Sequence, residues 1–431
     1  MAQPVAICYD MDALKETLCA LKVAFPGNFT HCIAIKSNPL PFFLKFAVRM
    51  GCGLEAASYA EALLALRTGC PPDKIMFDSP AKTRADIRFA LEYNIQINAD
   101  NFFELDRIAE ERKKLELPQD SGFLSSSVIG LRINPLVGEG KIKSLSVSDE
   151  SSKFGIALTA DAKTVILEYF RRFSWLSALH CHVGSQGCTL SQHAQGAKKL
   201  FELCEEINRE VGSTRIRRMD IGGGLPVNFE SEEISPTFDV YAKTLKEEVP
   251  ALFRGDLTVI TEYGRSVSAK AAWAACSIEY IKTISADYEI AVIQAGADLF
   301  LRTCYVPSNF SLRVTGHHRH SGKELQPHAE NVKAGSEVAR RVKRYDVAGP
   351  LCFGGDKITV NRSMPQLLVG DFVVVHDVGA NTLSMFSRHC SRQAPPVYGY
   401  RRRQEGDGVE VVLIKEMEPV EDVLRFWSCP L

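Results

Sequence analysis

The chain has 431 residues, of which 45% are hydrophobic and 24% are charged, and its formal net charge is −1. This length suits one or two cores of ordinary size, and this composition is typical of globular proteins. A net charge close to zero argues against general binding to nucleic acids or anionic membranes. We therefore expect neither a nucleic-acid partner nor a membrane partner.

The apolar residues are not arranged for a membrane or for secretion. No stretch has 18 consecutive apolar residues, and the first residues lack a basic segment followed by an apolar run. The 13 cysteines are scattered without a Cys-x-x-Cys pair, which favours free thiols in a reducing compartment. We predict a cytoplasmic protein.

Short apolar strands alternate with amphipathic helices over the first two thirds of the chain. After a strand-like start at residue 6, the first helix continues to about residue 25. Eight strands with helices between them predict a parallel (β/α)8 barrel, a TIM barrel, over roughly residues 15–265. The predicted strands are 32–35, 53–57, 75–78, 95–98, 127–133, 176–182, 216–221 and 257–261.

The pattern changes after about residue 270. Segments rich in β-branched and aromatic residues are separated by glycine turns, and helical periodicity becomes scarce. This pattern predicts an antiparallel β domain over 266–431, to which we assign residues 1–14. Its clearest strands are 272–285, 289–293, 372–375 and 408–414.

Chemically useful side chains occur where four barrel strands end, which is where active sites of this fold lie. Strand one ends at Lys36, and strand six ends in the segment 180–185. Strand seven ends in 220–224, and strand eight ends in 262–265. An amine, an imidazole, a triple-glycine turn and a carboxylate with an arginine are therefore expected at one face.

This combination suggests pyridoxal phosphate (PLP). Gly222, Gly223 and Gly224 let backbone N–H groups approach a phosphate, and Ser185 and Arg265 add further donors. Lys36 would form the imine with the cofactor, and Glu262 would keep its pyridine nitrogen protonated. His182 would stack on the ring. The alternative for His180 and His182 is a pair of core or zinc-binding histidines.

These residues resemble the fold type III PLP-dependent decarboxylases, which include diaminopimelate, ornithine and arginine decarboxylases. The resemblance covers nearly the whole chain, and HCHVGSQ with GPLC is similar to the diaminopimelate branch. Its motifs are AIKSNP (34–39), KFG (153–155), HCHVGSQ (180–186), DIGGGLP (220–226), EYGRS (262–266), GPLCFGGD (349–356) and GANTLSMFSRHCSR (379–392).

The resemblance implies a homodimer with shared active sites and an amino-acid substrate. Cys352, supplied by the partner chain, would reprotonate the substrate carbon after carbon dioxide leaves. The resemblance also implies roles for residues around the cofactor and the substrate. Arg132 would lie near the phenolic oxygen, Glu55 and Glu61 near the imine, Gly264 and Asn381 near the cofactor, and Arg302, Tyr305, Phe353 and Asp356 near the substrate.

Two departures concern the substrate and the phosphate. Phe353 stands where the family has an acidic residue that recognises the distal amino group, so a charge-assisted hydrogen bond of roughly 1.5–3 kcal/mol is lost. Asn381 stands where the family has a phosphate-binding tyrosine. We therefore predict a decarboxylase for an unusual amino acid, one of D configuration or with a second anionic group.

Two other functions remain open. An amino-acid racemase could use the same barrel, but such racemases place an arginine at the pyridine nitrogen, where this chain has Glu262. A decarboxylase-like regulator without turnover is favoured by Phe353 and Asn381. We predict no metal site, because two His-rich groups lack the spacing of a closed zinc site. These groups are His317, His318 and His320, and His389 with Cys390.

Overall fold

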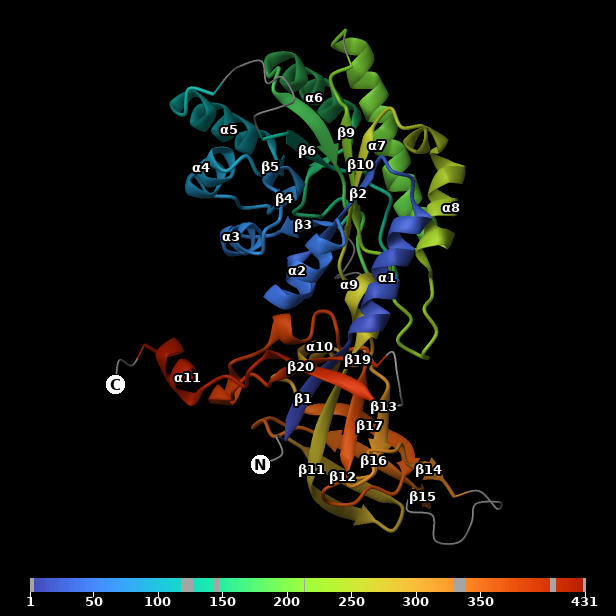
Figure 1. Ribbon diagram of the computed structural model, residues 1–431. Coiled ribbons are helices and arrows are strands. Elements are labelled where there is room, and N and C mark those ends of the chain that lie inside the picture. Colours follow the sequence, from blue (N-terminus) through green and yellow to red (C-terminus); the bar gives the residue numbers. More distant parts are fainter. Residues whose placement is uncertain are drawn as a thin grey trace. The chain divides into compact units, whose positions relative to one another are not determined.

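The structure is a computed structural model that describes residues 4–117, 127–142, 147–212, 214–328, 338–403 and 408–428. The chain divides into two compact units (Figure 1). One contains residues 17–227 and 234–267, and the other contains residues 1–16, 228–233 and 268–431.

The larger unit is a closed parallel barrel, which confirms the predicted TIM barrel. Strand β10 pairs with β2, and β5 pairs with β6, so the sheet has no free edge where the circle closes. Cys32, Met76 and Ile260 pack together as a buried cluster of barrel residues. The strands are β2 (Phe29–Ala34), β3 (Gly53–Ala56), β4 (Ile75–Asp78), β5 (Gln96–Ala99), β6 (Ile129–Asn134), β8 (Leu176–His180), β9 (Arg218–Gly223) and β10 (Thr258–Tyr263), with the short β7 (Ile156–Ala157) beside β6.

Helices follow the barrel strands, and several begin at side chains that satisfy the free backbone N–H groups of a helix start. Thr83 and Thr189 open α4 and α7 with capping boxes. In the part of the chain that is described, no helix has the length and apolarity to cross a membrane. The bounds are α1 (Met11–Ala24), α2 (Pro41–Arg49), α3 (Tyr59–Arg67), α4 (Arg84–Glu92), α5 (Phe102–Lys114), α6 (Ala160–Arg172), α7 (Leu190–Glu210) and α8 (Phe238–Glu248).

Strand ends differ from the sequence prediction at two positions. Strand β2 ends at Ala34, and Lys36 lies in the single 3-10 turn that follows, Ile35–Ser37. Strand β8 was expected to reach His182 but ends at His180, where its pairing with Asp220 also ends. Two residues further along β9, Gly222 has a φ of +67°, outside extended geometry, so regular pairing stops. Residues two apart share one face only within a regular strand, so this geometry does not apply to His180 and His182.

The second unit contains a mostly antiparallel sheet in the order β17-β16-β12-β11-β1-β19-β20, with β18 between β11 and β13. The N-terminal strand β1 lies between β11 and β19, and only the pairs β1–β19 and β12–β16 are parallel within this sheet. The strands of this sheet are β1 (Val5–Asp10), β11 (Ala272–Ser285), β12 (Tyr288–Ile293), β13 (Val314–His317), β16 (Val342–Ala348), β17 (Lys357–Pro365), β18 (Phe372–His376), β19 (Val397–Arg402) and β20 (Val409–Lys415). A separate pair of strands is formed by β14 (Gln326–Pro327) and β15 (Ala339–Arg340). The unit also contains the helices α10 (Leu301–Tyr305) and α11 (Val420–Phe426).

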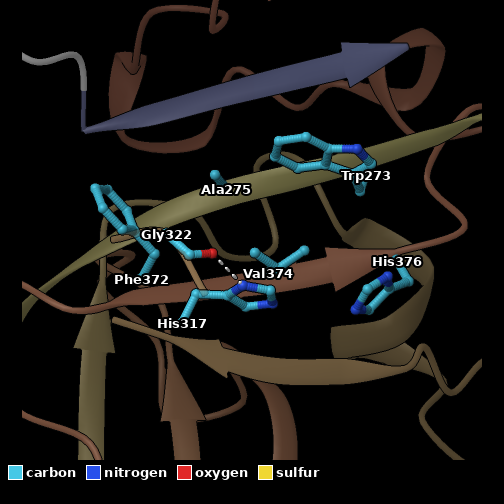
Figure 2. Close-up of a pocket in the computed structure, with 7 residues that line it drawn as sticks. All are labelled: Trp273, Ala275, His317, Gly322, Phe372, Val374 and His376. Carbon is cyan, nitrogen blue, oxygen red and sulfur yellow. Dashed lines mark hydrogen bonds between the residues drawn. The ribbon is translucent and has the colours of Figure 1, made fainter. Parts of the chain in front are cut away.

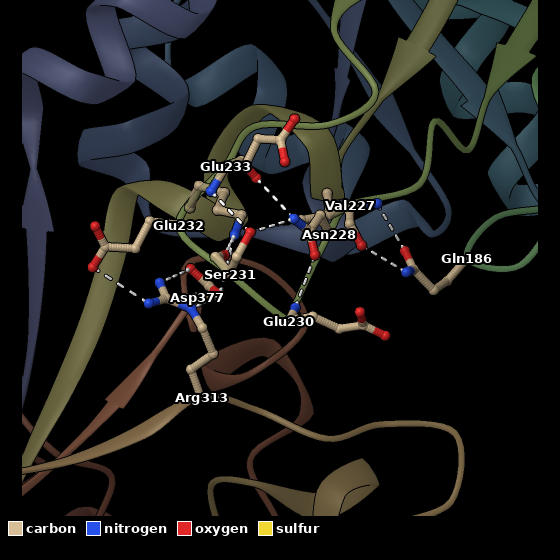
Figure 3. A network of polar contacts seen from close by, with 10 residues as sticks. Gln186, Val227, Asn228, Glu230, Ser231, Glu232, Glu233, Arg313 and Asp377 are labelled. Carbon is tan, nitrogen blue, oxygen red and sulfur yellow. Dashed lines mark hydrogen bonds and ion pairs between the residues drawn. The ribbon is translucent and has the colours of Figure 1, made fainter.

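A short segment, 228–233, belongs to this second unit although barrel residues flank it in sequence. Arg313 explains the attachment, because its guanidinium pairs with Asp377 through Nε at 3.2 Å and with Glu232 through Nη1 at 3.4 Å (Figure 3). The Asn228 amide donates to Ser231 Oγ at 2.8 Å, which holds the turn together. Charge pairing and local hydrogen bonds therefore place this segment.

The capping box of α7 gives a stability prediction. Replacing Thr189 by alanine removes the acceptor for the Gln192 N–H, so we expect the free energy of unfolding to fall by about 1 kcal/mol in urea titrations. Thr237→Ala is the matched control, because Thr237 opens α8 without a side-chain bond to the helix backbone. Equal losses in the two variants would contradict the prediction.

Candidate active site

Lys36 pairs with the buried Glu55 of β3 at the carboxyl end of the barrel. The lysine side chain is 53% exposed, whereas the Glu55 side chain is fully buried. Burial favours the neutral amine, but the carboxylates of Glu55 and Glu262 favour the ammonium more strongly, so the pKa of Lys36 is raised. Glu55 thus holds the amine on the buried side, and the rest of the lysine side chain is partly exposed to solvent.

Three carboxyl groups and one imidazole meet inside the barrel. Asp78, His180, Asp220 and Glu262 are all buried, and one ligand atom of each lies within 4.8 Å of the others. His180 Nε2 is 3.6 Å from Glu262 Oε2, and His180 Nδ1 is 3.8 Å from Asp78 Oδ1. Glu262 Oε1 has no hydrogen-bond partner among the described residues. One carboxylate oxygen is therefore available to a ligand.

These groups cannot all be charged. Burial and the neighbouring carboxylates raise the pKa of Asp78 and of Asp220 to about 7, and they raise the pKa of Glu262 well above its usual range. Burial lowers the pKa of His180 to about 4. At neutral pH the imidazole is neutral, and the carboxyl groups hold protons among themselves.

His182 lies just beyond β8 and is fixed from the glycine turn. The Gly223 N–H donates to His182 Nδ1 at 3.2 Å, which leaves Nε2 as the protonated nitrogen of the neutral ring. Burial, followed by the charge of Arg132, lowers the pKa of His182 well below its usual range. His182 therefore presents a neutral, oriented ring, 21% exposed, 4.0 Å from Glu262 Oε2.

The three glycines permit close approach of neighbouring backbones. A Cβ on Gly223 would lie 1.7 Å from the Glu262 carbonyl oxygen, and a Cβ on Gly224 would lie 1.7 Å from the Gly184 carbonyl oxygen. Gly222 and Gly224 also have positive φ values, of +67° and +93°. The glycines are thus required by the packing of the strand ends themselves.

The remaining barrel residues that were predicted for the site are Arg132, Ser185, Gly264 and Arg265. Arg132 on β6 is buried with its guanidinium 4.5 Å from the centroid of the Phe154 ring, which gives the KFG motif a structural role. A Cβ on Gly264 would lie 2.9 Å from the Ser37 side chain, so this glycine lets the turn after β10 approach the turn that carries Lys36. Arg265 begins the short helix α9 (Arg265–Ser268), and Ser185 follows β8 and is half-buried.

Glu61 has a local role in α3. Its carboxylate accepts from the Ala57 N–H at 2.7 Å, and its own N–H donates to the helix cap Ser58. The structure therefore places Glu55, and not Glu61, against the lysine.

The predicted substrate residues lie in the second unit. Tyr305 of α10 stacks on Phe353, with ring centroids 5.1 Å apart and an angle of 19° between the planes. The Arg302 guanidinium lies 5.2 Å from the centroid of the Phe310 ring, and its Nη1 is buried without a hydrogen-bond partner in the described chain. A buried guanidinium nitrogen without a partner suits an anionic group of a ligand, and Tyr305 lies on the same short helix as Arg302.

The loop that carries Cys352 is closed by Asp356. This buried carboxylate accepts from the N–H groups of Ala297 and Leu351, both at 2.6 Å. Because both oxygens bind backbone, this geometry favours a structural role over the predicted contact with substrate. Cys352 itself is exposed, and Asn381 adopts a φ of +55° in the turn after β18.

The histidines that we considered for metal binding are arranged differently. His317 lines a cavity of about 340 Å³ with Trp273, Phe372 and His376 (Figure 2). Its Nδ1 donates to the Gly322 carbonyl at 2.9 Å, and its Nε2 lies 3.0 Å from Thr315 Oγ1. Both ring nitrogens of His317 are therefore engaged.

The predicted residues thus form two groups, one within each unit. The barrel group brings together Lys36, His182 and Glu262, whereas the other group contains Arg302, Tyr305 and Phe353. Sequence reasoning missed Asp78 and Asp220 as members of the buried cluster. Asp78 is the last residue of β4, so its place at the end of a predicted strand was the signal in the sequence.

The buried carboxyl groups predict a pH effect on the ligand-free protein. Asp78 has a pKa of about 7 when folded and about 3.9 when unfolded, so the folded chain binds more protons between these values. This group therefore lowers the free energy of unfolding as the pH rises from about 4 to about 7. This decline amounts to up to about 1.4 kcal/mol per pH unit. We expect urea titrations of Asp78→Asn at several pH values to lack it.

The exposed Asp256 supplies the control for this experiment. Asp256→Asn should follow the wild-type pH dependence. Parallel curves of unfolding free energy against pH for wild type and Asp78→Asn would show that the Asp78 carboxyl group does not hold an additional proton in the folded chain.

Comparisons with known proteins give the same picture as the geometry. Residues 11–269 match the family described as pyridoxal-dependent decarboxylase, pyridoxal binding domain. Diaminopimelate decarboxylase of Helicobacter pylori strain J99 is 28% identical over 419 residues, which cover 97% of this chain and 94% of that protein. Diaminopimelate decarboxylase of Aquifex aeolicus is 27% identical over 387 residues, or 89% of this chain and 83% of that protein.

Solved structures agree. The crystal structure of Helicobacter pylori diaminopimelate decarboxylase complexed with L-lysine has a TM-score of 0.81 and 25% identity, and the match covers 99% of this chain and 97% of that one. A lysine/ornithine decarboxylase from Vibrio vulnificus shares the fold, with a TM-score of 0.70 over 89% of this chain and 91% of that one, at 22% identity.

The family match covers more than half of the chain and includes every barrel residue of the candidate site. It confirms the predicted family and the predicted cofactor. The chain therefore belongs to the pyridoxal-dependent decarboxylases, and it is a carboxy-lyase that uses pyridoxal phosphate.

Proposed function

We propose that this chain decarboxylates an amino acid whose distal end differs from that of diaminopimelate, ornithine or lysine and carries a second anionic group. The observation that carries this proposal is the buried Arg302 Nη1 without a partner in the described chain, on the same short helix as Tyr305, which stacks on Phe353. An amino acid of D configuration at the reacting carbon also fits.

The barrel residues suit the cofactor. Lys36 offers an amine at a strand end, and Glu262 Oε1 is a buried acceptor without a partner. His182 offers a neutral ring face whose orientation Gly223 fixes. We propose that Lys36 holds the cofactor covalently, that Glu262 binds its pyridine nitrogen and that His182 stacks on its ring.

Phosphate and phenolic contacts are assigned to the remaining barrel residues. Ser185, Gly264, Arg265 and the turn formed by Gly222, Gly223 and Gly224 would hold the phosphate. Arg132 would lie near the phenolic oxygen. The group Asp78, His180, Asp220 and Glu262 could also coordinate a cation, but the family assignment favours proton sharing with the cofactor.

The chemistry needs protons at two defined atoms. When bound, pyridoxal phosphate supplies an electron sink for the pair left as carbon dioxide departs. Burial keeps Glu262 protonated, so its carboxyl group can pass a proton to the ring nitrogen and remain as the counter-ion. Cys352 protonates the substrate carbon, and its hydrogen bond to Cys390 raises the pKa of the thiol, which keeps the proton in place at neutral pH.

We propose that the enzyme works as a homodimer with shared sites, in which Cys352 of the partner subunit serves each barrel. The exposed apolar residues of the second unit support this assembly. Strand β20 is an edge strand with exposed apolar residues on both faces, and Phe426 and Trp427 at the end of the chain are also exposed. Such surface is typical of protein interfaces. The exposed strand residues are Val409, Val411, Val412 and Leu413.

We also propose that the protein acts in the cytoplasm. Twelve cysteines lie in the described part of the chain, and all are free thiols, as expected in a reducing compartment.

Two measurements test the decarboxylase together. Purified protein with added cofactor should show the visible absorbance of lysine-linked pyridoxal phosphate, and Lys36→Ala should lose this band while Lys45→Ala, at an exposed site on α2, keeps it. Carbon dioxide release should then be measured on L-, D- and meso-amino acids with and without a second acidic group.

Cys352→Ala should retain the absorbance band and lose turnover by about 10²- to 10⁴-fold, the usual contribution of a general acid. A bound cofactor without turnover on the anionic members of the panel would contradict the proposed substrate class. Failure to bind the cofactor would favour the regulator over the enzyme.

The substrate argument predicts the effect of restoring a carboxylate. Phe353→Glu should raise kcat/KM for a diamino acid by about 10- to 150-fold, because a charge-assisted hydrogen bond is worth about 1.5–3 kcal/mol. Phe353→Gln has nearly the same shape without the charge and serves as the control. Equal activity of the two variants would show that charge at this position does not select the substrate.

A further inference from the structure

Two exposed cysteines lie side by side in the second unit. The Cys352 side chain hydrogen-bonds that of Cys390, although the two residues belong to different loops. The residues next to them are also close, because the Phe353 and His389 rings meet edge to face with centroids 6.4 Å apart. In the described chain, Cys19 is the one other exposed cysteine.

Both loops are fastened to the same turn, 296–298. Asp356, in the loop of Cys352, accepts from the Ala297 N–H at 2.6 Å. On the other side, Ser387 donates its N–H to the Asp298 carbonyl at 2.8 Å, and Arg392 Nε donates to Asp298 Oδ2 at 2.8 Å. The two thiols are therefore held together by the framework and not by chance approach of mobile loops.

Glycines allow this framework to close. A Cβ on Gly296 would lie 2.1 Å from Asp356 Oδ1, and a Cβ on Gly349 would lie 2.4 Å from Asp356 Oδ2. Cys390 and Ser391 both adopt left-handed backbone geometry, with φ values of +59° and +52°. These contacts therefore fix a turn whose backbone angles non-glycine residues rarely adopt, and Cys390 lies in that turn.

We propose that Cys352 and Cys390 form a reversible intramolecular disulfide that switches the enzyme off under oxidising conditions. The proposal rests on the proposed function in one respect only, the role of Cys352 as proton donor. In the disulfide, Cys352 no longer carries the thiol proton that it would donate, whereas the cofactor residues of the barrel are unchanged.

The oxidant is a low-molecular-weight disulfide such as glutathione disulfide. The Cys390 thiolate attacks one of its sulfurs, forms a mixed disulfide and releases one glutathione thiolate. The Cys352 thiolate then attacks the Cys390 sulfur and releases the second. Two protein thiols are oxidised, one glutathione disulfide is reduced to two thiols, and the two thiol protons pass to the released thiolates.

Proximity favours the second step, because the attacking sulfur is already in contact with its target. Formation of the bond brings the sulfurs to about 2 Å, which small rotations of two exposed side chains can supply. The exchange should accelerate as the pH rises, since the thiolate is the nucleophile. A disulfide of this kind in a reducing compartment is transient and redox-sensing.

The test uses the cofactor-loaded, full-length enzyme in buffers of increasing ratio of glutathione disulfide to glutathione. After acid quenching and digestion with trypsin, non-reducing mass spectrometry should find peptides 345–357 and 389–392 joined, with the loss of two hydrogens. Each of these peptides contains one cysteine. Decarboxylase activity should fall in proportion to the joined fraction, and dithiothreitol should restore it.

Two variants serve as controls. Cys390→Ser should yield no joined peptides at any ratio, whereas Cys19→Ser should behave like wild type. Free thiols, or separate glutathione adducts on Cys352 and Cys390 at the most oxidising ratio, would overturn the disulfide.

The peptide measurement does not depend on activity, so it separates this inference from the proposed function. Joined peptides with full activity would establish the disulfide and overturn its role as a switch together with the role of Cys352 as proton donor. An inactive preparation that still yields the joined peptides would point to failure of the proposed substrate and not of the disulfide.

Discussion

Three carboxyl groups enclosed with one imidazole in a barrel impose the main physical constraint on this enzyme. Asp78, Asp220 and Glu262 repel one another when ionised, and the closed barrel keeps water from screening that repulsion. The cluster therefore retains protons that ordinary carboxyl groups would lose. In the proposed function, a pyridine nitrogen held by Glu262 would relieve this repulsion by accepting a proton, and the neutral His182 would add no opposing charge.

The second unit keeps the loop of Cys352 in place through contacts that do not involve the side chain next to the thiol. Asp356 holds the Cys352 loop against the turn 296–298 through backbone groups, so the side chain next to the thiol can vary without loss of the loop. Phe353 uses that freedom by stacking on Tyr305. The turn 296–298 also binds the loop of Cys390, so one part of the framework positions both thiols.

Much of the barrel could be predicted because strand and helix periods differ and because helix caps have local sequence signals. Thr83 and Thr189 each begin a capping box, a four-residue pattern that marks the start of a helix. The end of β8 could not be predicted, because it depends on the partner strand, where Gly222 leaves extended geometry. Asp78 and Asp220 were missed as a pair because their coupling arises only when distant strands close a circle.

The sequence by itself determined the fold class, the family and the residue types that the chemistry needs, because each leaves a local pattern or a motif. Tertiary structure decided which of those residues act together. It placed Glu55 and not Glu61 against Lys36, used both oxygens of Asp356 for backbone, and paired two cysteines from separate loops. Contacts, burial and shared protons depend on distances between residues far apart in the chain, and no local pattern carries those distances.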